Sequence, residues 1–207
     1  MTSVMTNATT TRSEGPPRER MVRTAAQLIR TKGVSGTGLR EIVEGARGPR
    51  GSLQHYFPGG KDQLVSESLL WMGVVAAKRV TRVMSKLDAP TPGRLFSGTV
   101  DLWRKEFLTL GFGSGCPLMA AAADSSATSD AIREADCKAF DGWLEAMTEA
   151  LEEMGVQAPR SSTLATLMVS ALEGAIVLCR VRRETRPLDA VEEELRPLLE
   201  AAVTTAG

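Results

Sequence analysis

The stretch "RGPRGSLQHYFPGGK" (Arg47–Lys61) holds the only histidine of the chain, His55, and its only tyrosine, Tyr56. It is basic and rich in glycine and proline, and a long run of helix-forming residues follows it. Because proline suits the first turn of a helix, Pro49 predicts a short helix over residues 49–57, which the next proline and two glycines end. This helix either carries a catalytic histidine or contacts a negatively charged partner.

Two more helices are predicted upstream of this stretch. Apolar residues recur at the spacing of an amphipathic helix over 17–32, between a pair of prolines and Gly33. A shorter helix is predicted over 39–46, and Arg47-Gly48 forms a tight turn after it. Three short helices with a tight turn between the last two make a helix-turn-helix arrangement. No segment before residue 60 has the alternation that strands need.

The rest of the chain is also predicted to be helical, so the expected fold class is all-α with about nine helices. The further helices are predicted over 61–88, 94–110, 117–123, 128–154, 160–183 and 188–203. Pro197 lies inside the last pattern and predicts a kink or a split helix. The expected organisation is a disordered tail over 1–16, a helix-turn-helix domain over 17–60, and a helical body over 61–207.

Charge is distributed unevenly, although the chain as a whole is neutral. Residues 1–61 carry ten Lys or Arg and four Asp or Glu, a net charge of +6, so the remainder carries −6. A basic N-terminal part on an acidic body favours a partner that is a polyanion, often nucleic acid.

Cysteine usage and apolar stretches indicate a cytoplasmic protein with no membrane partner. The cysteines Cys116, Cys137 and Cys179 are widely spaced and form no C-x-x-C pair, which argues against a disulfide framework or a zinc site. The first residues lack the apolar segment of a secretory signal. The most apolar stretch, Thr163–Cys179, contains Glu173 and is short for a bilayer span.

The run "GLREIVEGARGPRGSLQHYFPGGKDQLV" resembles the DNA-binding signature of TetR-type transcriptional regulators, over roughly residues 18–65. The spacings that agree with this signature are those of Ile42, Leu53, Tyr56-Phe57 and Lys61. The runs "PRGSL" and "FPGGK", with "GCPL" and "EGAIVLCR" later, are most similar to the LmrA/YxaF-like branch. Two positions differ from the family pattern: the turn reads Ala-Arg-Gly-Pro in place of Ala-Gly-Val-Ser, and Gln54 stands where an aromatic residue is common.

The resemblance implies that the third helix enters the major groove of an operator in double-stranded DNA. The residues expected to contact DNA are Thr37, Arg40, Arg50, Gly51, Ser52, Gln54, His55, Tyr56 and Lys61. Four of them have alternatives that the sequence leaves open: an N-cap for Thr37, a pair with Glu44 for Arg40, a solvated charge for Arg50, and a packing role for Tyr56.

A catalytic role for His55 would need a nucleophile or a second base held nearby. The sequence offers no such pair, no metal-ligand spacing and no phosphate-binding loop. We therefore expect no enzyme activity, no metal and no cofactor. A helical enzyme or carrier with a basic appendage, and an architectural DNA-binding protein without a ligand, are the alternative classes.

The resemblance also implies a ligand pocket in the body for a small hydrophobic effector. Its expected lining is Trp71, Met72, Trp103, Phe107, Phe112, Cys116, Leu118, Met119, Trp143, Met147, Met168 and Glu173. Aromatic and Met side chains suit an adaptable apolar cavity, although such residues at helical spacing also form ordinary cores. Glu173 is an acid inside an apolar run, and would meet a cationic or hydroxyl-bearing ligand or form a hydrogen bond at an interface.

The last two helices are expected to form a homodimer through a four-helix seam, since Gly174-Ala175 permits close approach of two helices. The function predicted from these features is a ligand-responsive repressor. It would bind a palindromic operator as a dimer and leave it when the effector binds. A ligand-independent DNA-binding protein or an activator is the alternative.

Overall fold

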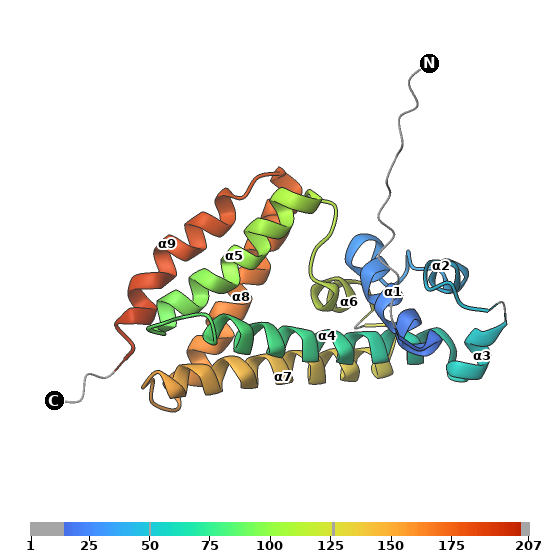
Figure 1. Ribbon diagram of the computed structural model, residues 1–207, viewed down its shortest axis with the longest axis horizontal. Helices are drawn as coiled ribbons and strands as arrows, with labels where there is room; N and C mark the ends of the chain where they lie inside the picture. Colours follow the sequence, from blue (N-terminus) through green and yellow to red (C-terminus); the bar gives the residue numbers. More distant parts are fainter. Residues whose placement is uncertain (1–14, 50, 126, 204–207) are drawn as a thin grey trace, which may run out of the picture.

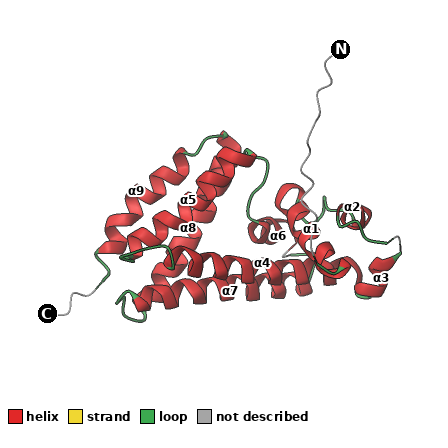
Figure 2. Cartoon of the chain, viewed as in Figure 1, coloured by secondary structure: helices red, strands yellow, loops and turns green. Residues whose placement is uncertain are grey.

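The computed structural model describes residues 15–49, 51–125 and 127–203, and within these ranges all regular structure is helical. The expectation of an all-α chain is confirmed (Figures 1 and 2). The tail predicted over 1–16 lies almost wholly outside the described residues. The described helices are α1 (Pro17–Lys32), α2 (Leu39–Gly45), α3 (Ser52–Tyr56), α4 (Gly60–Met84), α5 (Pro92–Leu110), α6 (Pro117–Ser125), α7 (Asp130–Glu153), α8 (Arg160–Arg182) and α9 (Arg186–Glu200).

Proline and glycine set several of the helix ends, as the sequence predicts. Helix α1 has proline in its first turn and ends at Gly33, whose φ of 72° lies in the left-handed region and whose N–H donates to Ile29 O at 3.0 Å. At the start of α5, the Thr91 hydroxyl accepts from the Arg94 N–H at 3.2 Å, and Gly111 ends that helix with a φ of 78°.

Three predicted boundaries are wrong. Helix α3 begins at Ser52 and not at Pro49, because Gly51 adopts a left-handed φ of 83° that no helix interior contains. Helix α4 ends at Met84, four residues earlier than expected. Helix α9 ends at Glu200, three residues earlier than expected, and it is not split at Pro197. The kink predicted as the alternative to a split stays a prediction. Pro197 leaves the carbonyl group of Glu193 without its helical donor, and Glu193 is an exposed residue that water can reach.

The N-terminal helices α1–α3 and the start of α4 share a small hydrophobic core of their own, and we call this part the head. Its buried members are Met21, Val22, Ala25, Ile42, Ala46, Phe57 and Leu64. The other helices, with the remainder of α4, form the body around a larger core, which Ala26 and Ile29 of α1 and the loop residue Val34 also enter. Helix α4 is therefore common to both parts, since Leu64 lies in the head core and the next residue, Val65, in the body core.

Two long helices, α4 and α7, lie side by side along the body (Figure 1). Gly73 of α4 is the point of closest approach, since a Cβ atom there would lie 2.7 Å from the Cα atom of Ala139. Helices α5, α8 and α9 pack together at the end of this pair that lies away from the head (Figure 1).

Helix α8 contains the most apolar stretch of the sequence. Within the described residues it is long and apolar enough to cross a membrane, which corrects the expectation that the stretch is too short. Half of its most apolar window is nevertheless buried inside the protein, as happens for core helices of globular proteins.

We expect Gly73→Ala to lower the free energy of unfolding by about 1–3 kcal/mol, because the added methyl group collides with backbone atoms of α7. Gly142→Ala is the matched control within α7, since a Cβ there has no neighbour within 4 Å. It should raise stability by about 0.5–1 kcal/mol through helix propensity. Urea unfolding followed by circular dichroism measures both. Equal effects of the two substitutions would show that the α4–α7 contact does not limit stability.

Candidate functional site

The turn between α2 and α3 is as tight as the sequence predicts. Arg47 has a φ of 49°, an uncommon left-handed conformation for a residue with a side chain, and the Gly48 N–H donates to Val43 O at 2.9 Å. A Cβ atom at Gly48 would lie 2.4 Å from the Cε atom of Met21 in the head core. Glycine at this position therefore lets α2 and α3 pack closely against α1.

The side chain of Arg20, on α1, forms hydrogen bonds to the backbone of this turn. Its Nε donates to Ala46 O at 2.8 Å and its Nη2 to Arg47 O at 3.3 Å. Carbonyl groups at the end of a helix lack helical partners, so the guanidinium group replaces the missing donors. No local pattern predicts this role for Arg20, because an arginine on an amphipathic helix is normally solvated.

Helix α3 presents Gln54 and His55 to the outside of the head. Both are exposed, and the Gln54 Nε2 makes only a long bond of 3.3 Å to Pro58 O. The His55 ring meets the Tyr56 ring edge-on with centroids 5.1 Å apart. Tyr56 is partly buried and packs against the head core, which is the alternative that the sequence left open for it. Gly51, just before the helix, is exposed.

Two of the remaining residues expected to contact DNA lie at the head surface. Arg40 is exposed on α2, and no ion pair joins it to Glu44 in the described part of the chain. Lys61 lies in the first turn of α4 and is partly exposed. Arg50 falls outside the described residues.

The other two hydroxyl-bearing residues are engaged within the head. Thr37 is buried, with 1% of its surface exposed, and its hydroxyl donates to Gly33 O at 2.6 Å. It therefore faces the inside of the loop between α1 and α2, and neither touches solvent nor acts as the N-cap. Ser52 is partly exposed, and its hydroxyl donates to Pro49 O at 2.7 Å.

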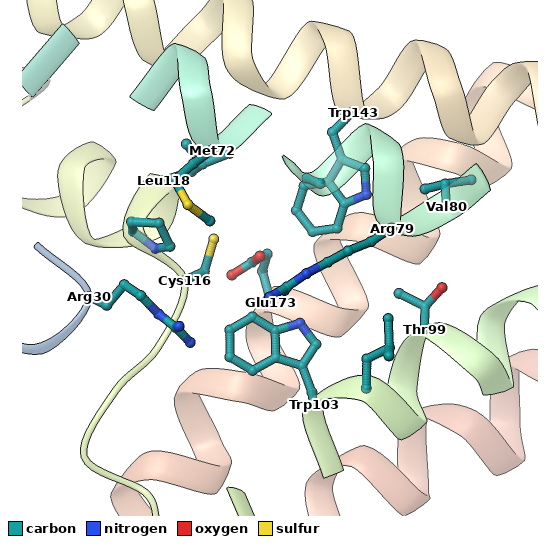
Figure 3. Close-up of a pocket in the computed structure, with 13 residues that line it drawn as sticks. Arg30, Met72, Arg79, Val80, Thr99, Trp103, Cys116, Leu118, Trp143 and Glu173 are labelled. Carbon is teal, nitrogen blue, oxygen red and sulfur yellow. The ribbon is translucent and has the colours of Figure 1, made fainter. Parts of the chain in front are cut away.

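A second candidate site is a cavity enclosed by the head and the body together (Figure 3). Its volume is about 30 Å³, enough for one or two water molecules and far below the several hundred cubic ångströms of a typical ligand pocket. The cavity is lined by Arg30, Met72, Ala76, Arg79, Val80, Thr99, Leu102, Trp103, Cys116, Pro117, Leu118, Trp143 and Glu173. An effector would therefore have to part these walls.

Six of the residues named as lining from the sequence lie in the wall of this cavity. Trp103, Cys116, Trp143 and Glu173 line the cavity, together with Met72 and Leu118. The other residues proposed as lining do not reach it. Met147 and Met168 are buried in the body core, Met119 packs against that core, and Phe107 stacks between Trp103 and Phe112. Trp71 lies instead in a surface depression between α1 and α4.

Glu173 of α8 is the only acid in the cavity wall. Only 3% of its surface is exposed, and neither carboxylate oxygen has a partner with good hydrogen-bond geometry among the described residues. The Cys116 thiol is close enough to act on the carboxylate as a weak donor. Burial raises the pKa of Glu173 to about 7, with the charge of Asp136 adding to the rise and the Cys116 thiol opposing it. Burial also raises the pKa of Asp136 to about 7, and that of Cys116 well above its usual range.

Arg30 joins the cavity to the head. This residue stands in the last turn of α1, yet it is 7% exposed and forms an ion pair with Glu106 of α5. Its Nε donates to Gly115 O at 2.8 Å, its carbonyl accepts from the Gly115 N–H at 3.0 Å, and its guanidinium lies 5.6 Å from the Trp103 ring centroid. The Arg30 side chain thus lines the cavity and also bonds the head to the body.

A second contact between head and body involves Asp124 of α6. The Ser35 N–H and hydroxyl both donate to the Asp124 carboxylate, at 2.6 and 2.7 Å. These bonds lower the pKa of Asp124. The sequence predicted neither this contact nor that of Arg30, because each joins residues far apart in the chain.

Comparisons with known proteins agree with this architecture. Residues 22–67 match the family model described as bacterial regulatory proteins of the tetR family, and residues 92–194 match the C-terminal domain of LmrA/YxaF-like transcriptional regulators. The HTH-type transcriptional regulator Rv0196 of Mycobacterium tuberculosis is 37% identical over 188 residues, 88% of this chain and 94% of its own length. The HTH-type transcriptional regulator LmrA of Bacillus subtilis is 30% identical over 181 residues, 85% of this chain and 93% of its own length.

Solved structures show the same fold at lower sequence identity. The reduced form of Escherichia coli NemR aligns with a TM-score of 0.75 and 24% identity, over 87% of this chain and 95% of that one. A TetR transcriptional regulator from Legionella pneumophila aligns with a TM-score of 0.77 and 19% identity, over 91% and 100%.

The fold and these matches define a helix-turn-helix transcriptional regulator. The chain belongs to the TetR family, and its C-terminal domain is that of the LmrA/YxaF-like branch. The expectations of this family, and of a regulator in place of an enzyme, are confirmed by the comparisons.

We expect the stability of the protein to fall as the pH rises from about 4.5 to about 7. Glu173 has an ordinary pKa of 4.5 in the unfolded chain and one of about 7 when folded. The folded state therefore binds the proton more tightly than the unfolded state. The free energy of unfolding falls between these two pKa values and does not recover at higher pH. Glu173→Gln should flatten this fall and be more stable than the parent at pH 8, by on the order of 3 kcal/mol.

Urea unfolding at pH 5 and pH 8 measures this difference. Asp136→Asn should act in the same direction, because the pKa of Asp136 is raised by the same cause. Glu145→Gln, at an exposed position of α7, is the control and should leave the pH dependence unchanged. Identical pH dependence of the parent and Glu173→Gln would show that the carboxyl group is not desolvated as the structure indicates.

Proposed function

We propose that the protein is a ligand-responsive transcriptional repressor, which binds a palindromic operator as a dimer and leaves it when a small hydrophobic effector enters the cavity. The observation that carries this proposal is the double role of Arg30. It lines the cavity in the body and holds α1 of the head through Glu106 and Gly115. A ligand that rearranges the cavity wall thereby changes how the head is held.

In this proposal α3 lies in the major groove. Gln54 is exposed on it and carries an amide suited to the edge of adenine, while His55 and Tyr56 donate to phosphates or to thymine. Arg40 and Lys61 contact the phosphate backbone, and the small residues Gly51 and Ser52 let the chain approach it. Arg50 reads guanine or holds a phosphate by its position in the sequence. Thr37 takes no part, because it is buried.

A dimer is supported by an apolar face on α8 that none of the described residues covers. Its exposed members are Leu167, Val177, Leu178 and Val181, and a Cβ atom added at Gly174 would meet nothing within 4 Å. A contiguous exposed apolar face is typical of a protein–protein interface. A second copy of the chain would cover it and place two α3 helices for half-sites about 34 Å apart.

The proposed switch follows from the small size of the cavity. In this conformation the lining side chains pack against one another and leave room for only one or two water molecules. Effector binding has to move Arg30, Trp103 or the segment at Cys116, and each of these lies at the joint with the head. The effect on DNA binding is limited to the difference in effector affinity between the two head orientations.

We expect the protein to select a palindromic sequence from a random DNA library, and to bind it far more tightly than random DNA at the same salt concentration. Gln54→Ala should weaken binding to the selected site by about 1–3 kcal/mol and leave random DNA unaffected, if Gln54 reads a base. Lys61→Ala should weaken both kinds of DNA alike.

Lys86→Ala is the control for this experiment, because it removes an exposed charge in the turn that follows α4, at the end of that helix that lies away from the head. Fluorescence anisotropy with the DNA of the protein's own upstream intergenic region and with random DNA measures each affinity. Failure to enrich any sequence would contradict the repressor proposal and favour an architectural DNA-binding protein.

We expect Val181→Asp to convert the dimer to a monomer, because it places a charge on the exposed face of α8, where Val181 is 78% exposed. Sedimentation velocity measures the change. Val74→Asp, at an exposed apolar position of α4, is the matched control and should remain dimeric. A monomeric parent protein, or a Val181→Asp variant that stays dimeric, would rule out the α8 interface.

A further inference from the structure

Glu173 is the feature of the cavity that an ordinary core does not explain. The carboxyl group is removed from water, yet neither oxygen has a partner with good hydrogen-bond geometry among the described residues, and the nearby Cys116 thiol is only a weak donor. Its neighbours in the wall are the Cys116 thiol and the indole rings of Trp103 and Trp143, and in Figure 3 the Arg79 side chain runs between the two rings and ends beside the carboxyl group. A ligand that enters between the rings therefore displaces the Arg79 side chain, which is partly exposed. A buried acid without a partner lowers stability, so the site is incomplete as it stands.

Two guanidinium groups line the same cavity, and both are directed toward Glu106 of α5. Arg30 of α1 is paired with Glu106 of α5, and Arg79 of α4 also leans toward Glu106, with its Nη2 3.9 Å from Oε2. Within the described residues, neither guanidinium forms an ion pair with Glu173. Asp136 of α7 adds a second buried acid, whose charge acts on Glu173.

We propose that the cavity binds an organic cation, a protonated amine on an apolar body, with the ammonium group against Glu173 and the apolar body between Trp103 and Trp143. The inference rests on the proposed function, since it specifies the effector of that cavity. Folding has already removed the carboxylate from water, so an approaching cation gains its attraction without that cost. Indole faces add a cation–π attraction that a neutral hydroxyl group does not receive.

Protonation of Glu173 gives this assignment a second signature. An ammonium ion binds the ionised carboxylate, and the pKa of Glu173 is about 7 before the ligand enters. Below that pH the proton must leave first, so the amine should bind about tenfold more tightly at pH 8 than at pH 6. Asp136 acts in the same direction, because burial also raises the pKa of this acid to about 7.

The experiment compares phenylbutylamine with phenylbutanol, which share one apolar body and differ in the ammonium and hydroxyl groups. Titration calorimetry of the full-length protein at pH 8 should show that the amine binds at least about tenfold more tightly. Glu173→Gln should abolish the preference, because the amide keeps the shape and removes the charge. Asp136→Asn is the matched control, since Asp136 is a buried acid outside the cavity wall, and it should keep most of the preference.

Thermal unfolding of each variant shows that it is folded. Equal binding of amine and alcohol, no binding of the amine at millimolar concentration, or an amine preference that survives Glu173→Gln overturns the inference. Addition of the amine to the complex with operator DNA tests the proposed function separately. Tight binding of the amine without release of the DNA would refute the switch and leave the cation site standing.

Discussion

The buried guanidinium group of Arg30 is the interaction on which the arrangement of head and body depends. A charge removed from water is tolerated only when it is paired and hydrogen-bonded, and Arg30 meets this condition through Glu106 and Gly115. Both partners belong to the body, while Arg30 belongs to the head. The head can therefore take another orientation only if this group finds other partners or returns to water.

Helix α4 makes the same joint rigid in a second way. It contributes to the hydrophobic cores of head and body at successive residues, Leu64 and Val65, and Trp71 packs against both cores. A continuous helix shared by two cores transmits a displacement of one end to the other, because packed cores rearrange between discrete states and do not deform gradually. The Ser35–Asp124 contact ties the loop after α1 to α6, so the head is held along two sides.

Local sequence signals predicted most of the helices and some of the candidate sites. Prolines and left-handed glycines mark helix ends through backbone geometry alone, which is why Gly33 was correctly assigned. The start of α3 was assigned wrongly, because Pro49 fits either the first turn of a helix or a turn before it. The left-handed conformation of Gly51 places Pro49 in the turn. Thr37 looked like an accessible hydroxyl, and only the fold reveals that it is buried.

The sequence indicated the kinds of residue that line the cavity, but not which residue of each kind reaches it. Trp71 and Trp103 have the same side chain, and tertiary packing alone directs one to a surface depression and the other to the cavity. Arg30 resembled a solvated charge at the end of an amphipathic helix, since its partners lie 76 and 85 residues away. Glu173 was the exception, because an acid within an apolar run is conspicuous without any structure.

The charges of the cavity link its ligand chemistry to the proposed switch. Arg30 and Arg79 already share one acid, Glu106. A cation at Glu173 would add a third positive charge to a region of low dielectric constant, where its repulsion of the two guanidinium groups is poorly screened. Arg79 is partly exposed and can move toward water, whereas Arg30 is enclosed. Repulsion would therefore act most strongly on the group that holds the head, and by linkage a head held by DNA would disfavour the cation to the same degree.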